Sequence, residues 1–200
     1  LFDRGQMVLP NTVKHLIILI PNEGHHGPGE EDEARFIAQP FLPQNAIVGP
    51  GIQVAWFNGD VGHEHNIVVS DTNGAQLFET GEFTELEAST PITFNTTGDF
   101  EYADTVEYEG GFVMTGNIRV VDQGVTATTP TASFDTVGAL MVPSMDVQNI
   151  AASIKNAGFQ NVKVLSEQLY MDGEQVDSRK ITSIVIKAEK TTKNEVQFSQ

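Results

Sequence analysis

The chain has 200 residues, of which 40% are hydrophobic and 19% are charged, and its formal net charge is −16 at pH 7. Phosphate binding needs clustered Lys and Arg, so we expect no nucleic-acid partner, and an anionic membrane surface is disfavoured for the same reason. Without any cysteine, the chain cannot form disulfides, thiolate-bound zinc sites or iron–sulfur clusters. Its longest aliphatic run, Leu16–Ile20, is too short for membrane insertion, which takes about 20 apolar residues.

Residues 1–127 predict strands throughout. Short runs rich in Val, Ile, Thr and aromatic residues are separated by turn residues at a spacing typical of a β-sandwich or barrel. These runs are HLIILI, AIVGPGIQVAWF, HNIVVSD, PITFNTTGDFEYAD and GFVMTGNIRVV. In the second run, alternation places Ile52, Val54 and Trp56 on one face of the strand. The pattern therefore predicts a strand that buries one face, with Ile52, Val54 and Trp56, in a hydrophobic core.

A stretch of small residues divides the chain. QGVTATTPTAS, residues 123–133, is typical of a linker. The charge changes across it, because residues 1–130 carry 19 acidic and 4 basic side chains, whereas residues 131–200 carry 8 and 7. We therefore expect two domains, at residues 1–127 and 128–200.

The second domain contains the only helical pattern. In SMDVQNIAASIKNAGF the apolar residues recur at the spacing of an amphipathic helix, which Ser144 or Asp146 can cap and Gly158 can end. Strands are predicted before it in FDTVGALMVP and after it in NVKVLSEQLYM and ITSIVIKAEK. The order β-α-β-β predicts a small α+β domain with its helix on one face of a sheet.

Three stretches of the first domain resemble the cupredoxin family. In FLPQNAIVGPGIQVAWFNGDVGHEHNIVV, a proline-bearing strand entry is followed by a Val-x-Trp-x-Asn strand and a His-Asn pair that opens the next strand. GEFTELEASTPITFNTTGDFEYAD and GGFVMTGNIRVV resemble the later part, up to the Met-x-Gly and the last strand. The resemblance covers roughly residues 36–121. It implies a cupredoxin-like Greek-key β-sandwich with a metal site at one end. With the small α+β domain that the pattern predicts after it, the expected fold class is mainly β.

The resemblance also implies where the ligands of a copper site would lie. His65, before Asn66, occupies the place of the first histidine, and Met114 that of the axial methionine. Asp104 stands where the copper-binding cysteine should be, and Glu107 where the second histidine should be, with Glu109 as a rival. Because blue-copper chemistry needs a thiolate, the composition excludes a blue centre and its electron transfer.

The same end of the sandwich can still hold a different metal. His63 and His65 are one residue apart at a strand opening, so alternation places both on one face. With Asp104 and Glu107 they offer imidazole and carboxylate donors for one mononuclear ion, copper first, with zinc, iron or manganese as alternatives. His25 and His26, on a Gly- and Pro-rich loop, are further candidates.

Three functions remain open at this point. We expect first an exported, cupredoxin-like metal-binding protein that is extracellular, periplasmic or on the cell surface; the chain begins with Leu1, which leaves room for a removed signal or anchor. The alternative is a metal-free structural or interaction subunit of a cell-surface or membrane-associated assembly that retains only the fold. A mononuclear metalloenzyme is the third, although no catalytic motif is evident. The near-neutral residues 131–200 suit contact with another protein or a second copy.

Overall fold

A computed structural model of the protein describes residues 6–22, 24–26, 39–108, 112–122, 136–139, 146–169 and 182–190. The chain divides into two compact units, Leu1–Met141 and Val142–Gln200. The predicted linker and the predicted boundary between residues 127 and 128 lie outside the described residues, so both stay predictions. No helix in the described parts of the chain is long and apolar enough to cross a membrane.

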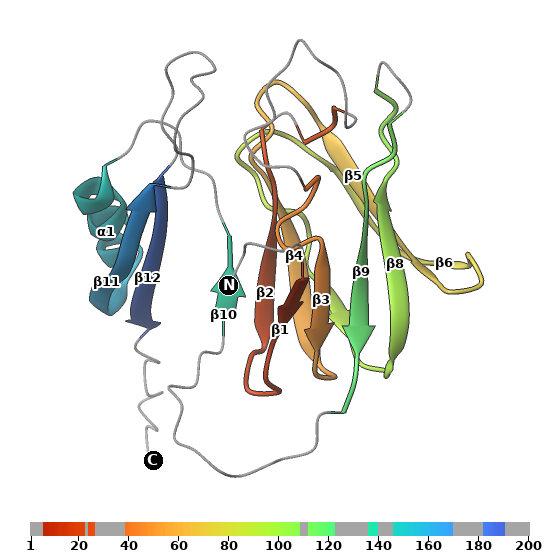
Figure 1. The fold of residues 1–200 in the computed structure, drawn as a ribbon, viewed down its shortest axis with the longest axis horizontal. Coiled ribbons are helices and arrows are strands. Elements are labelled where there is room, and N and C mark those ends of the chain that lie inside the picture. Colours follow the sequence, from red (N-terminus) through yellow and green to blue (C-terminus); the bar gives the residue numbers. More distant parts are fainter. Residues whose placement is uncertain are drawn as a thin grey trace, which may run out of the picture. The chain divides into compact units, whose positions relative to one another are not determined.

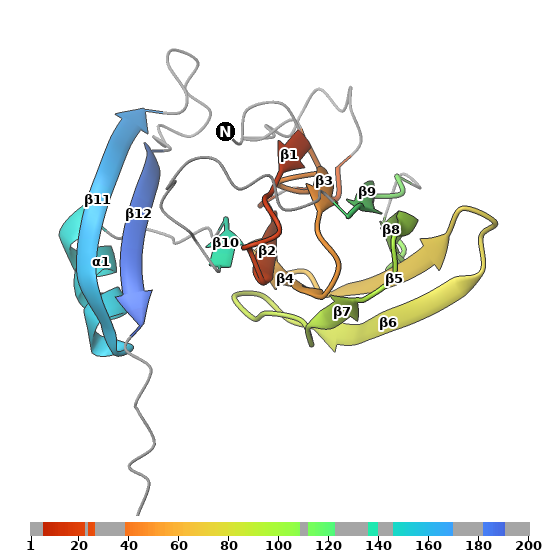
Figure 2. The ribbon, with the colours of Figure 1, turned by 90° about the horizontal axis from the view of Figure 1, so that it is seen from below.

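The first unit is a sandwich of two β-sheets (Figure 1, Figure 2). One sheet has six strands, in the order β1 (Gln6–Val8), β3 (Asn45–Val48), β9 (Thr115–Val120), β8 (Gly98–Asp104), β5 (His65–Asp71) and β6 (Gln76–Phe83). The other has four, in the order β10 (Thr136–Gly138), β2 (His15–Ile20), β4 (Ile52–Asn58) and β7 (Ile92–Phe94). The chain passes repeatedly between the two sheets, and only β5–β6 and β8–β9 are successive strands of the same sheet. This strand order confirms the expected mainly β, cupredoxin-like Greek-key sandwich.

Alternation along β4 builds the centre of the core, as predicted. Ile52, Val54 and Trp56 are all buried, and the intervening side chains are exposed or half-buried. The Trp56 ring meets the ring of Tyr102, on β8 of the opposite sheet, edge-on at a centroid distance of 5.2 Å. The Tyr102 hydroxyl donates to the carbonyl oxygen of Gln44 at 2.8 Å, so its polar end is satisfied. A buried side chain of this size contributes roughly 1.5–3 kcal/mol, and these rings therefore hold the two sheets together beside the polar end of the sandwich.

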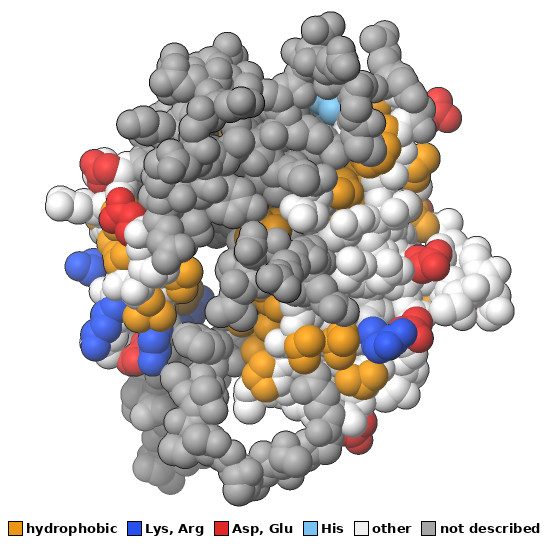
Figure 3. Space-filling view, viewed as in Figure 1, with side chains coloured by type: hydrophobic (Ala, Val, Ile, Leu, Met, Phe, Trp, Pro, Cys, Tyr) orange, Lys and Arg blue, Asp and Glu red, His pale blue; other side chains and the backbone are white. Residues whose placement is uncertain are grey.

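The second unit consists of α1 (Val147–Asn156) and an antiparallel pair, β11 (Phe159–Leu169) and β12 (Thr182–Lys190). Of the two predicted caps, the structure selects Asp146, whose carboxylate accepts from the amide of Asn149 at 2.7 Å. Gly158 follows the helix with a φ of 90°, a conformation that favours glycine. Basic side chains gather on this unit (Figure 3), in keeping with the charge contrast in the sequence.

The strand that the sequence predicts before the helix pairs with a strand of the first unit. The strand expected within residues 134–143 forms over Thr136–Gly138, but it pairs in parallel with β2, with Thr136 opposite His15. It thus extends the four-stranded sheet of the first unit, and the described part of the second unit has the order α-β-β rather than β-α-β-β. The physical reason is that an edge of the sandwich, at β2, offers unpaired backbone groups to the returning chain.

Candidate metal centre

The turn between β4 and β5 places polar side chains at one end of the sandwich. Asn58, the fully buried last residue of β4, organises this turn from within. Its side-chain amide donates to the carbonyl of His63 at 2.8 Å, and its side-chain oxygen accepts from the amide of Asp60 at 2.8 Å. Gly62 has a φ of 84°, which lets the chain reverse between them. Asp60 and His63 are thereby held next to His65, the first residue of β5.

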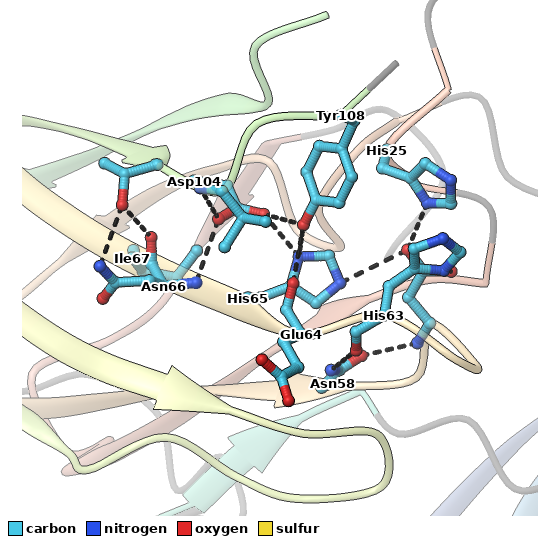
Figure 4. A network of polar contacts seen from close by, with 12 residues as sticks. His25, Asn58, His63, Glu64, His65, Asn66, Ile67, Asp104 and Tyr108 are labelled. Carbon is cyan, nitrogen blue, oxygen red and sulfur yellow. Dashed lines mark hydrogen bonds and ion pairs between the residues drawn. The ribbon is translucent and has the colours of Figure 1, made fainter.

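Three imidazole rings surround the carboxylate of Asp60, which is fully buried. Its Oδ2 lies 2.6 Å from Nδ1 of His25 and 3.4 Å from Nε2 of His65, and its Oδ1 lies 3.7 Å from Nδ1 of His63. In His25, Asp60 and His63, the candidate ligand atoms lie within 4.8 Å of one another. We call His25, Asp60, His63 and His65 the His–Asp60 cluster (Figure 4).

Two nitrogens of the cluster are buried without a hydrogen bond. Among the described residues, Nδ1 of His63 and Nε2 of His65 have no hydrogen-bond partner, although both face the Asp60 carboxylate. Buried polar atoms are nearly always hydrogen-bonded, so each exception calls for an explanation such as an ion. The cluster is not sealed, because the His63 side chain is 39% exposed and a histidine side chain reaches the surface at this end of the sandwich (Figure 3).

On the other side of its ring, His65 contacts Asp104. Nδ1 of His65 lies 2.5 Å from Oδ2 of Asp104, and the second carboxylate oxygen accepts from the amides of Asn66 and Val106, each at 3.1 Å. The Tyr108 hydroxyl lies 2.8 Å from both Oδ2 of Asp104 and Nδ1 of His65. Figure 4 shows the His65 ring between Asp104 and Tyr108 on one side and His63 on the other.

The contacts between His65 and Asp104 shift the pKa of each residue in the direction opposite to the effect of burial. Burial lowers the pKa of His65, but the hydrogen bond to Asp104 and the nearby carboxylates of Asp104 and Asp60 outweigh it, so that this pKa is raised. Burial raises the pKa of Asp104, but His65 and the two backbone amides outweigh it and lower this pKa. Burial, followed by the charge of Asp104, raises the pKa of Tyr108. Without a metal, the contact therefore favours the charged forms of His65 and Asp104, which together would be a buried ion pair.

The structure brings some of the predicted ligands together and separates others. His63 and His65 both belong to the cluster, and Asp104 contacts His65. Glu107 is exposed, and Met114 is buried, with its carbonyl oxygen accepting from the Asp104 amide at 3.0 Å. As ligands, these residues stay predictions, and Glu109 lies outside the described residues.

Sequence reasoning missed Asp60 and Tyr108. Asp60 precedes the two histidines in the spacing Asp-x-x-His-x-His, and this spacing around a turn could have drawn attention to it. Tyr108 has no comparable signal, because its hydroxyl meets His65 from a position 43 residues later in the chain. His25, named among the further candidates, reaches Asp60 from 35 residues away.

A blue-copper centre does not fit this end of the sandwich. The chain has no cysteine, and Asp104 at the corresponding position already contacts His65 directly. This contact, at 2.5 Å, engages Nδ1 of His65, whereas Nε2 of the same ring faces Asp60. The donors that fit a metal are the imidazole and carboxylate atoms around Asp60.

No protein-family model and no curated protein matches the chain. Similar solved structures include a purple cupredoxin from Nitrosopumilus maritimus, with 22% identity over 52% of this chain and 98% of that chain and a TM-score of 0.41. Reduced rusticyanin is 15% identical over 59% of this chain and 85% of that chain, with a TM-score of 0.41. Reduced auracyanin from Roseiflexus castenholzii is 15% identical over 55% of this chain and 98% of that chain, with a TM-score of 0.40. The fold assignment rests on the strand order of the chain itself.

Proposed function

We propose that the protein binds one divalent transition-metal ion through His25, Asp60 and His63, as an exported metal-binding protein without blue-copper chemistry. The observation that carries this proposal is the pair of buried imidazole nitrogens, on His63 and His65, that face a buried carboxylate without making a hydrogen bond. A cation among these atoms would satisfy them together. The acidic charge of the first unit would raise the local concentration of cations.

The donor set favours particular ions. Imidazole nitrogens with one carboxylate oxygen suit Cu(II), Zn(II) and non-haem Fe(II). Among divalent first-row ions, nitrogen and oxygen sites bind Cu(II) most tightly, so copper is the first candidate, with zinc or iron as alternatives. An extracellular, periplasmic or cell-surface location belongs to this proposal.

A metal-free role is the second candidate, because two contacts of the cluster are complete without an ion. His25 lies 2.6 Å from Asp60, and His65 lies 2.5 Å from Asp104. Such buried pairs can hold the turn before β5 in place in a structural or interaction subunit of a surface assembly. A protein partner or second copy, bound through residues 131–200, is part of this second candidate, and sedimentation of the full-length protein over a range of concentrations tests self-association.

Titration of the metal-free, full-length protein with Cu(II) and Zn(II) separates the two candidates. We expect one equivalent to bind, and His63→Gln to weaken binding by at least about 100-fold, since even partners outside the ligand shell cost 10–100-fold. His15→Gln is the matched control, because His15 is an exposed histidine at the opposite end of β2 from the site and its loss should leave affinity unchanged. Failure of both metals to bind would support the metal-free role, and equal weakening by the control would refute the site.

A further inference from the structure

His65 has a carboxylate at each ring nitrogen, and the two contacts differ. Oδ2 of Asp104 lies 2.5 Å from Nδ1, whereas Oδ2 of Asp60 lies 3.4 Å from Nε2 and makes no hydrogen bond with it. The ring itself is completely buried. Nδ1 of His65 is therefore engaged by Asp104, and Nε2 is available to bind a ligand.

Asp104 is fixed in the orientation that engages Nδ1. It lies opposite Ile67 in the ladder between β8 and β5, and its Oδ1 accepts from the amides of Asn66 and Val106. Its Oδ2 is left for His65 and for the Tyr108 hydroxyl at 2.8 Å. An ionised carboxylate only accepts hydrogen bonds, and the two backbone amides together with His65 favour that ionised form.

This arrangement determines which nitrogen of His65 carries the proton. A lone pair on Nδ1 would face the Asp104 oxygen at 2.5 Å and would be repelled, so Nδ1 must donate. The Tyr108 hydroxyl has one hydrogen, which can go to Asp104 or to the carbonyl of Glu64 at 2.9 Å, while its oxygen remains an acceptor toward Nδ1. In neutral His65 the lone pair then lies on Nε2 and points toward Asp60.

We infer that Asp104 is a positioning residue, which holds His65 with its proton on Nδ1 so that Nε2 becomes a fourth ligand of a metal at the His–Asp60 cluster. This inference rests on the proposed metal binding. A metal-bound histidine commonly donates its other ring nitrogen to a carboxylate in this way, which fixes the orientation of the ring. The sequence resemblance gave Asp104 the place of a ligand; here it lies on the far side of the His65 ring from the ion.

Nitrogen-15 NMR of the histidine side chains in the full-length protein, with zinc as the probe, tests the inference. In the zinc-loaded protein we expect His65 to keep its proton on Nδ1 and Nε2 to shift as a ligand does. Asp104→Asn should lower zinc affinity by about 10–100-fold and reduce the preference for the Nδ1 proton. Asp99→Asn is the control, because Asp99 is an exposed aspartate of the same strand.

The outcomes separate this inference from the proposed function. Zinc that shifts His25 and His63 but not Nε2 of His65, or that displaces the proton from Nδ1, would overturn the inference alone. Unchanged zinc affinity in a folded Asp104→Asn variant would do the same. Zinc that perturbs none of the cluster histidines would refute the metal site itself. If Asp104→Asn does not fold, the nitrogen assignment in the wild-type protein still decides.

Discussion

Replacement of Asp60 by asparagine tests the role of the carboxylate that lies among the three imidazole rings. The side chain is fully buried, and its two oxygens face nitrogens of His25, His63 and His65 at 2.6, 3.7 and 3.4 Å. Asparagine has nearly the same shape and can still accept from His25, but it has no negative charge to offer an ion. Asp60→Asn therefore removes the anionic ligand with little change in volume.

The size of the effect follows from the affinity that is lost. Loss of a residue outside the ligand shell typically lowers metal affinity about 10–100-fold. Loss of an anionic ligand itself should lower metal affinity by at least about 100-fold. A loss of about 100-fold at saturating metal removes about 2.7 kcal/mol of metal-linked stability. For a domain of roughly 150 residues, 1 kcal/mol shifts Tm by about 2–4 °C. The increase in Tm on adding zinc should thus be about 5–10 °C smaller in Asp60→Asn than in the wild type.

Thermal unfolding followed by circular dichroism, with and without zinc, measures this difference. Each protein is its own reference, so any change in metal-free stability cancels. Asp99→Asn, at an exposed site on β8, should show the wild-type increment. An Asp60→Asn increment equal to that of the wild type would refute the assignment of Asp60 as a ligand.

The hydrogen bonds and packing around the site give three further predictions. Tyr108→Phe removes the hydroxyl that lies 2.8 Å from Asp104 and should lower the free energy of unfolding by about 1–2 kcal/mol in urea titrations; an unchanged midpoint would contradict the hydrogen bond. A Cβ on Gly116 would overlap the ring of Tyr102, so Gly116→Ala should cost about 1–3 kcal/mol or more, and a neutral result would mean that the buried ring can move aside. In the metal-free protein, the raised pKa of His65 adds stability that is present below about pH 6.5 and is lost as the pH rises through the folded-state pKa of His65. The lowered pKa of Asp104 adds stability that is present above about pH 3.8 and is lost as the pH falls through the folded-state pKa of Asp104. Unfolding free energy should therefore be greatest between these limits, and a profile that lacks both declines would argue against the ion pair.

Local patterns were sufficient to predict the helix and most of the strands, although β1 and β6 were missed. Alternation identified the buried face of β4, with Ile52, Val54 and Trp56, because the period of side chains along a strand is set by local geometry. The helix and its cap at Asp146 follow equally local rules. The resemblance placed His65 at the metal end of the sandwich, and the structure puts it in the His–Asp60 cluster.

Partners across long stretches of sequence could not be predicted. His25 reaches Asp60 from 35 residues away, and the strand at Thr136–Gly138 pairs with β2, because such contacts depend on the whole sheet arrangement. Nor does a motif give distances. The sequence placed Asp104 next to His65, but only the geometry shows that Oδ2 of Asp104 contacts Nδ1 of His65 directly, at 2.5 Å.

X-ray absorption spectroscopy of the copper-loaded, full-length protein tests the central claim most directly, because it identifies the atoms bound to the ion. We predict one copper per chain with only nitrogen and oxygen ligands at about 2.0–2.2 Å and with the outer-shell scattering of imidazole rings. A sulfur ligand, which would have to come from a methionine since the chain has no cysteine, or a ligand shell without imidazole would contradict a hard site built from His25, Asp60 and His63.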